Sequence, residues 1–176
     1  GWVIVAFTSA RFAAMAVNRI ADREIDAANP RTAMRELPRG VLTVRDAALA
    51  TIAMTLLFLL SAWQLNPLCL ALAPVALLWV FGYSYTKRFT RWSHLVLGVG
   101  IAIAPVGGYL AVTGSWSDPA WMLLALASAV AAWVGGFDIL YALQDVQFDT
   151  MHGLHSIPRA FGEVGAFRIA RGLHLY

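Results

Sequence analysis

Five long apolar segments constrain this chain more than any other feature of its sequence. Each approaches or exceeds the roughly 20 residues that cross a bilayer as a helix. Hydrophobic residues make up 60% of the chain and charged residues only 13%, well below the roughly 25% that is typical of soluble domains. The sequence therefore predicts an all-α, multi-span transmembrane helical bundle. The segments run from Gly1 to about Ala27, from Thr43 to about Trp63, from Asn66 to Tyr83, from Trp92 to about Val112, and from Ser117 into the stretch that ends at Asp149.

Helix-boundary signals accompany these segments. Thr43 and Asp46 have the spacing of a capping box, and Asn66 followed by Pro67 provides a cap and a first-turn proline. The fourth segment contains GVGIAIAPVGG, where small residues favour close helix packing and Pro105 favours a kink.

The two ends of the chain interrupt apolar segments. The chain opens without Met inside the first segment, and it stops soon after a sixth helical segment begins in RAFGEVGAFRIARGLHLY. We therefore expect a single transmembrane domain over residues 1–176 that is truncated at both ends.

The basic residues are sorted along the chain. Of the 13 lysines and arginines, all except Arg11 fall in or beside the loops after the first, third and fifth segments. This asymmetry is the positive-inside signal of membrane proteins. We therefore expect the basic loops on the cytoplasmic face of a bacterial-type inner membrane, with Trp63, Trp116 and Trp121 at the opposite interface.

Two acidic stretches end apolar segments beside these basic loops. VNRIADREID places Asn18, Asp22 and Asp26 four residues apart, and DILYALQDVQFD places Asp145 and Asp149 at the same spacing. On a helix, residues four apart share a face, so each stretch presents a ladder of acidic side chains. The same spacing arises by chance on a solvated helix face. Here both ladders end membrane segments on one side, and ionisable residues at membrane depth are costly and usually functional.

Facing acidic ladders would repel each other unless a cation lay between them. Carboxylates suit Mg²⁺, which commonly binds one or two of them together with phosphate oxygens. We therefore predict that the ladders bind Mg²⁺ and a diphosphate above an apolar chamber, which suits a substrate with a charged head and a hydrocarbon tail. The predicted metal ligands are Asp22, Asp26, Asp145 and Asp149, and the nearby cations are Arg23, Arg31, Arg35, Lys87 and Arg88.

Two charged residues lie deeper in the apolar segments. Arg11 precedes Asn18 by seven residues and Asp138 precedes Asp145 by seven, so each lies about two turns below its ladder on nearly the same helix face. They either form a structural ion pair or line the reaction chamber. Tyr141, one turn before Asp145, either packs between helices or turns its ring toward a developing cation.

Four motifs occur together in this chain. They are N-x-x-x-D-x-x-x-D from Asn18 with the following NPRTAMRELPRG, Y-x-x-T-K-R from Tyr83, D-x-x-Y-x-x-x-D-x-x-x-D from Asp138, and HGLHSIPRAFG. In this order they resemble the UbiA superfamily of intramembrane aromatic prenyltransferases, especially the 4-hydroxybenzoate polyprenyltransferase branch.

The resemblance implies a nine-helix fold, of which this chain would contain the second to sixth spans and the start of the seventh. It implies Mg²⁺-dependent transfer of a polyprenyl group from polyprenyl diphosphate to a ring carbon of a hydroxylated aromatic acid in quinone biosynthesis. Asn18 and the four ladder aspartates would bind metal and diphosphate, while Arg35, Lys87 and Arg88 would contact the diphosphate. Asp138 or a ladder carboxylate such as Asp145 would activate the acceptor hydroxyl. The expected partners are these two substrates and the lipid bilayer, with no nucleic acid.

Two positions depart from the family pattern. Arg19 follows Asn18 where many members have Asp, and His155 stands where many have Lys, which removes a permanent cation near the diphosphate. The HSIP sequence resembles members of menaquinone synthesis, so a dihydroxynaphthoate acceptor is the alternative. His94, His152 and His174 show no ligand spacing and are expected at the interface or in loops.

A cation transporter that uses the paired aspartates is the alternative from another functional class. Transporters generally place ion-coupling residues near the bilayer midplane, often at broken helices. In this chain the ladder aspartates lie at segment ends, beside basic loops that would oppose the approach of a cation. The enzyme is therefore the favoured prediction.

Overall fold

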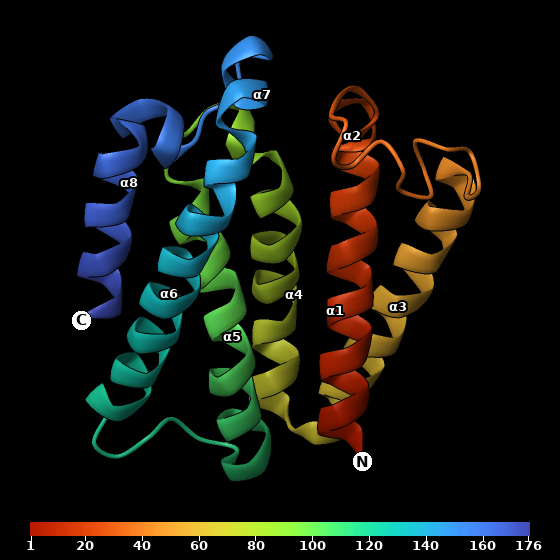
Figure 1. Cartoon of the computed structure of the whole chain (residues 1–176). Coiled ribbons are helices and arrows are strands. Elements are labelled where there is room, and N and C mark those ends of the chain that lie inside the picture. The colour runs from red at the N-terminus through yellow and green to blue at the C-terminus, as the bar shows by residue number, and fades with distance from the viewer. The chain divides into compact units, whose positions relative to one another are not determined.

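The computed structural model describes residues 1–176, and all of its regular structure is helical (Figure 1). Five helical stretches are long and apolar enough to cross a membrane, so the predicted all-α, multi-span fold is confirmed. The elements are α1 Trp2–Ala21, α2 Arg23–Ala28, α3 Val44–Leu65, α4 Pro67–Gly82, η1 Tyr83–Arg88, α5 Ser93–Thr113, α6 Trp121–Ala142, η2 Leu143–Asp145, α7 Val146–Met151 and α8 Ile157–His174.

Large apolar side chains project outward along these helices. Ile4 is 71% exposed, Leu78 is 74% exposed and Val112 is 81% exposed. A water-soluble protein rarely exposes extended apolar surface of this kind, whereas lipid covers it without cost. The chain is therefore a multi-pass membrane protein.

The two predicted helix caps, at Thr43 and Asn66, are confirmed. The Thr43 hydroxyl accepts a hydrogen bond from the Asp46 amide at 3.1 Å, and the Asp46 carboxylate accepts one from the Thr43 amide at 3.2 Å. The Asn66 side chain accepts a hydrogen bond from the Cys69 amide at 2.9 Å, with Pro67 in the first turn of α4. These caps satisfy backbone amides that have no partner inside the helix.

Residues Gly1–Ser84 form one compact unit, in which α1 packs against α3 and α4. Small residues make this packing close: Ser9 is 1% exposed, Ala13 is 0% exposed and Ser61 is 0% exposed. The hydroxyls of both serines donate to backbone carbonyls of their own helix, at 2.7 Å to Val5 and Leu57 respectively. Their burial therefore leaves no donor without a partner.

Residues Tyr85–Tyr176 form the second compact unit, in which α6 packs against α5 and α8. A Cβ added at Gly98 would lie 2.2 Å from the Ala131 carbonyl oxygen, so this glycine is needed where α5 meets α6. The close packing predicted for GVGIAIAPVGG is therefore confirmed at Gly98. At Gly107 and Gly108 it stays a prediction, because within the second unit no atom lies within 4 Å of an added Cβ.

The sorting of basic residues is less complete than the sequence predicted. Arg168 and Arg171 were assigned beside the loop after the fifth segment, but they lie within α8. The helix begins at Ile157 because Ser156 caps it, and so it extends over both arginines.

Candidate active site

The first acidic ladder does not lie on one continuous helix. α1 ends at Ala21, and Asp22 separates it from α2 with φ −96° and ψ 7°. The prediction of an unbroken helix to about Ala27 is therefore wrong. Backbone hydrogen bonds between residues four apart nevertheless continue across the break. The Asp22 amide donates to the Asn18 carbonyl at 2.9 Å, and the Asp26 amide donates to the Asp22 carbonyl at 2.7 Å.

Asn18 connects the first ladder to the start of η1, the segment that follows α4. Its side-chain amide donates to the Asp22 carboxylate at 3.1 Å and lies 3.5 Å from the Ser84 hydroxyl. Ser84 is only 4% exposed and belongs to the Y-x-x-T-K-R motif. Two of the four motifs therefore meet within the first unit.

The loop after α2 brings a cation onto Asp26. The Asn29 carbonyl accepts from the Thr32 amide at 2.9 Å, and the Thr32 hydroxyl donates to the Asp26 carbonyl at 3.2 Å, so the NPRT sequence folds back on the helix end. This turn places Arg35 over Asp26, where one guanidinium nitrogen lies 2.8 and 2.7 Å from the two carboxylate oxygens. Asp26 is 5% exposed, so its charge is compensated inside the protein.

The second ladder is also interrupted. α6 ends at Ala142, and the 3₁₀ segment η2 carries Asp145 before α7 begins. A 3₁₀ segment has three residues per turn rather than 3.6, so the prediction of one regular helical face from Asp138 to Asp149 is wrong. Asp145 and Asp149 are nevertheless both buried, at 6% and 0% exposure.

Lys87 forms an ion pair with Asp149. Its ammonium nitrogen lies 3.2 Å from Asp149 Oδ1, and its carbonyl accepts from the His155 amide at 2.8 Å. The other carboxylate oxygen, Asp149 Oδ2, is buried and has no hydrogen-bond partner. A buried carboxylate oxygen without a partner is costly, and a cation would satisfy it.

These contacts argue against a solvated acidic face. Three of the four ladder aspartates are almost fully buried, and two of them hold cations that the sequence assigned to diphosphate binding. No three His, Cys, Asp or Glu side chains gather closely enough to form a metal site by themselves. Mg²⁺ commonly binds one or two carboxylates and completes its shell with phosphate and water, so the donors, above all Asp149 Oδ2, fit this ion.

The remaining predicted residues differ in their surroundings. Arg11 is exposed and has no hydrogen bond or ion pair within the first unit. Tyr141 is 47% exposed. The Arg88 guanidinium lies 5.2 Å from the centre of the Tyr85 ring. The two ladders belong to different units, so their facing each other stays a prediction, as does an ion pair between Arg11 and Asp138.

His94 lies within a helix and not in a loop, which was one of the two positions that the sequence suggested. It is 1% exposed in the first turn of α5, and its Nδ1 lies 2.7 Å from Asp138 Oδ2 on α6. Sequence reasoning missed this pair because the two residues are 44 positions apart. The only available signal was that each is a polar residue in an apolar segment.

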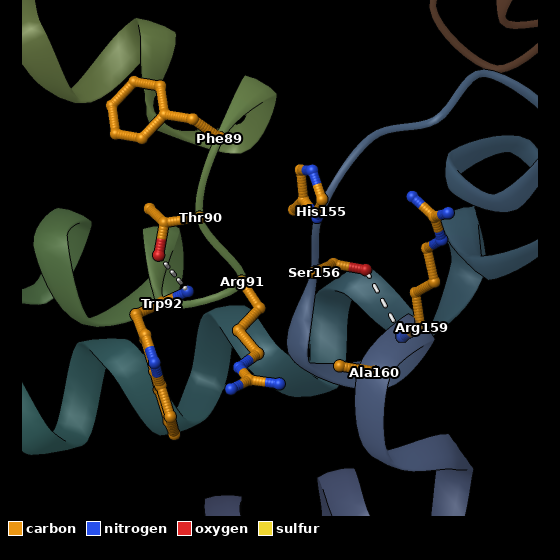
Figure 2. A pocket seen from close by; sticks show the side chains of 8 residues that line it. All are labelled: Phe89, Thr90, Arg91, Trp92, His155, Ser156, Arg159 and Ala160. Carbon is orange, nitrogen blue, oxygen red and sulfur yellow. Dashed lines mark hydrogen bonds between the residues drawn. The ribbon is translucent and has the colours of Figure 1, made fainter.

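A basic pocket of about 480 Å³ lies in the second unit (Figure 2). Two segments form it, residues 89–92 and residues 155–160, and no carboxylate lines it. The Arg91 guanidinium lies 5.7 Å from the centre of the Trp92 ring and 5.3 Å from that of Phe161, while the Arg159 guanidinium donates to the Leu154 carbonyl. Sequence reasoning noted the loss of a lysine at His155 but missed the two arginines beside it. The lining residues are Phe89, Thr90, Arg91, Trp92, His155, Ser156, Arg159 and Ala160.

A sequence model of the UbiA prenyltransferase family matches residues 1–176. The 4-hydroxybenzoate octaprenyltransferase of Methylobacillus flagellatus is 33% identical over 159 residues, which cover 90% of this chain and 53% of the relative. The enzyme of the same name from Escherichia fergusonii is 30% identical over 172 residues, covering 96% of this chain and 58% of the relative. The chain thus spans about half the length of the curated relatives it matches.

Two solved structures have the same fold. The apo structure of a UbiA homologue from Aeropyrum pernix K1 superposes with a TM-score of 0.93 at 35% identity, covering 99% of this chain and 65% of the homologue. A UbiA homologue from Archaeoglobus fulgidus, bound to DMAPP and Mg²⁺, gives a TM-score of 0.78 at 22% identity, covering 98% of this chain and 61% of the homologue.

Proposed function

The chain belongs to the UbiA prenyltransferase family, and we propose that it forms the catalytic part of an enzyme of quinone biosynthesis. The enzyme would transfer a polyprenyl group from polyprenyl diphosphate to a ring carbon of 4-hydroxybenzoate. The names of the relatives support this acceptor. The two compact units would belong to one transmembrane domain, with both acidic ladders at the cytoplasmic face of a bacterial-type inner membrane.

The burial of Asp149 beside Lys87 is the observation that most strongly supports this proposal. Asp149 keeps one oxygen on Lys87 and one oxygen without a partner, although it is 0% exposed. Buried carboxylate oxygens in native proteins are nearly always paired, so the unpaired oxygen of Asp149 favours a ligand role over a purely structural one. The arrangement is the one expected of a ligand that awaits a divalent cation.

The ladder aspartates would hold the metal and thereby the donor. Mg²⁺, when bound, would neutralise the negative charge that develops on the diphosphate as the allylic carbon–oxygen bond breaks. Arg35 and Lys87 act as counterions of Asp26 and Asp149 before the donor binds. Both cations then turn to the diphosphate, together with Arg88, while Asn18 keeps Asp22 oriented.

The deeper residues would act on the prenyl group and the acceptor. Loss of diphosphate leaves an allylic cation, and the half-exposed Tyr141 ring can stabilise it through its π face. The ring carbon beside the acceptor hydroxyl attacks this cation and forms the new carbon–carbon bond. Asp138 accepts the hydroxyl proton as the ring carbon attacks, and the released diphosphate takes the proton of the attacked carbon, which restores aromaticity. Asp138 then returns its proton to the phenolate oxygen, so the product keeps its hydroxyl group. Arg11 would contribute to substrate binding in the same chamber.

An acceptor assay tests the proposed function. The full-length protein in lipid nanodiscs is incubated with Mg²⁺, prenyl diphosphates of several lengths, and either 4-hydroxybenzoate or a dihydroxynaphthoate. We expect prenylated 4-hydroxybenzoate as the product, detected by mass spectrometry. Product from the dihydroxynaphthoate alone would place the protein in the menaquinone branch, and product from neither acceptor would refute the proposal.

Ligand dependence distinguishes the enzyme from a cation transporter. Because Mg²⁺ completes its shell with diphosphate oxygens, Mg²⁺ together with a prenyl diphosphate analogue should raise the melting temperature of the full-length protein. Mg²⁺ alone should raise it much less. Equal stabilisation by Mg²⁺ alone, together with Mg²⁺ flux into proteoliposomes, would favour the transporter.

Two arginines of the basic pocket, Arg91 and Arg159, would supply the positive charge that is lost where His155 stands in place of a lysine. Arg91 and Arg159 form no ion pair and line the pocket beside His155, so both guanidinium groups are available to an anion. We expect Arg91→Gln and Arg159→Gln each to raise the inhibition constant of inorganic diphosphate about tenfold, since a charge-assisted hydrogen bond contributes roughly 1.5–3 kcal/mol. Arg168→Gln, at an exposed position of α8, is the matched control. Unchanged constants in both pocket variants would exclude a role in diphosphate binding.

A further inference from the structure

Three helices of the second unit meet at His94. The residue lies in the first turn of α5, its Nδ1 lies 2.7 Å from Asp138 Oδ2 on α6, and its Nε2 lies 3.4 Å from the backbone nitrogen of Ile157, the first residue of α8. With 1% exposure, the ring has no access to water. A buried imidazole is tolerated because both of its nitrogens have partners.

The hydrogen-bond chemistry determines the tautomer of this ring. The Ile157 amide can only donate, so Nε2 must be the acceptor. In a neutral imidazole the other nitrogen then carries the proton. Nδ1–H therefore donates to Asp138 Oδ2, and a ring with the opposite tautomer would place two donors against each other at Ile157.

Close helix packing makes this contact available. A Cβ added at Gly135, one turn before Asp138, would lie 3.1 Å from the Leu95 side chain and 3.4 Å from the His94 carbonyl oxygen. The absence of a side chain at Gly135 thus lets α6 approach the start of α5. At the start of α8, Ile157 packs in one buried core with Ile139, and both side chains are 0% exposed. This core fixes the position of the Ile157 amide, which donates to His94.

Asp138 itself is only partly covered. Its side chain is 28% exposed, and His94 binds Oδ2, which leaves Oδ1 for another partner. On the basis of the proposed function, we propose that His94 is a positioning residue for prenyl transfer. It holds the Asp138 carboxylate through Nδ1–H, so that Oδ1 faces the chamber and receives the hydroxyl proton of the aromatic acceptor.

A double-mutant cycle in the full-length enzyme tests this role. His94→Phe removes both ring hydrogen bonds, and we expect kcat to fall about 100-fold, as in Asp138→Asn, with the KM for the prenyl diphosphate unchanged. His94→Phe combined with Asp138→Asn should be no slower than Asp138→Asn alone, because both substitutions remove one function. His94→Asn, whose amide keeps a donor near the Nδ1 position, should retain kcat within about threefold although it loses the bond to Ile157.

A purely structural role predicts different results. The melting temperature would then fall in both His94 variants while kcat per folded molecule stayed the same. An effect of His94 on catalysis that is independent of Asp138 would instead make the two losses of kcat multiply in the double variant. Either result would overturn the proposed role of His94. The proposed function itself would still stand if the wild-type protein catalysed prenyl transfer. A wild-type protein without prenyl transfer would instead overturn the function itself.

A spectroscopic measurement carries the test if His94→Phe does not fold. In ¹⁵N-histidine-labelled full-length protein, the His94 signal, assigned by its loss in His94→Asn, should report a proton on Nδ1. Asp138→Asn should change the shift of this nitrogen. A proton on Nε2 in the wild-type protein would contradict the proposed geometry.

Discussion

Replacing Asp22 or Asp145 with Asn in the full-length protein should reduce kcat/KM for the prenyl diphosphate by several hundred-fold to about 1000-fold. An amide is nearly isosteric with a carboxylate but carries no charge, so it is a poor ligand for Mg²⁺. Loss of one group that stabilises a developing charge typically costs roughly 3–4 kcal/mol, which corresponds to a factor of several hundred to about a thousand. Prenyl transfer at saturating Mg²⁺ measures the effect.

The control for these variants is Asp118→Asn. Asp118 is exposed in the loop before α6, whereas Asp145 follows the other end of this helix. This substitution removes the same charge and should leave activity unchanged. Near wild-type turnover in both ladder variants would show that Asp22 and Asp145 do not bind the metal.

Replacing Arg35 with Gln should destabilise the protein by about 2 kcal/mol in the absence of Mg²⁺ and substrate. Removing one partner of a fully buried ion pair costs roughly 3–5 kcal/mol, because the other charge stays buried without compensation. Here Asp26 is buried and the Arg35 side chain is 31% exposed, so the expected loss is smaller. Denaturant unfolding of the detergent-solubilised full-length protein measures it, with the exposed Arg39→Gln in the same loop as control.

A second substitution separates the structural part of this pair from its function. Asp26→Asn combined with Arg35→Gln removes both charges, so most of the lost stability should return. Activity should not return, because the double variant lacks both a metal ligand and a diphosphate contact. Recovery of activity together with stability would mean that the pair serves only folding.

The sequence located most of the fold and most of the candidate site. Apolar length predicted five spans, and the caps at Thr43 and Asn66 followed from residues within one helical turn. The spacing of the acidic ladders also selected four aspartates as candidate ligands, and three of these are buried. Each of these signals is local, since it depends on neighbours within about four positions along the chain.

The helix breaks at Asp22 and η2 could not be predicted from the sequence. Both stretches have uninterrupted helical periodicity and contain neither Pro nor Gly, so nothing local marks the point where the helix ends. Periodicity predicts which residues share a face but cannot report tertiary forces on the backbone.

Partner choice was decided by tertiary structure alone. The sequence by itself determined that this is a multi-span helical membrane protein with acidic helix ends and basic loops. Only the packing of α5, α6 and the following segments paired Lys87 with Asp149, 62 positions away, and His94 with Asp138, 44 positions away. The physical reason is that a buried charge or ring nitrogen takes whichever partner the packed backbone brings within about 3 Å, and sequence spacing carries no information about that distance.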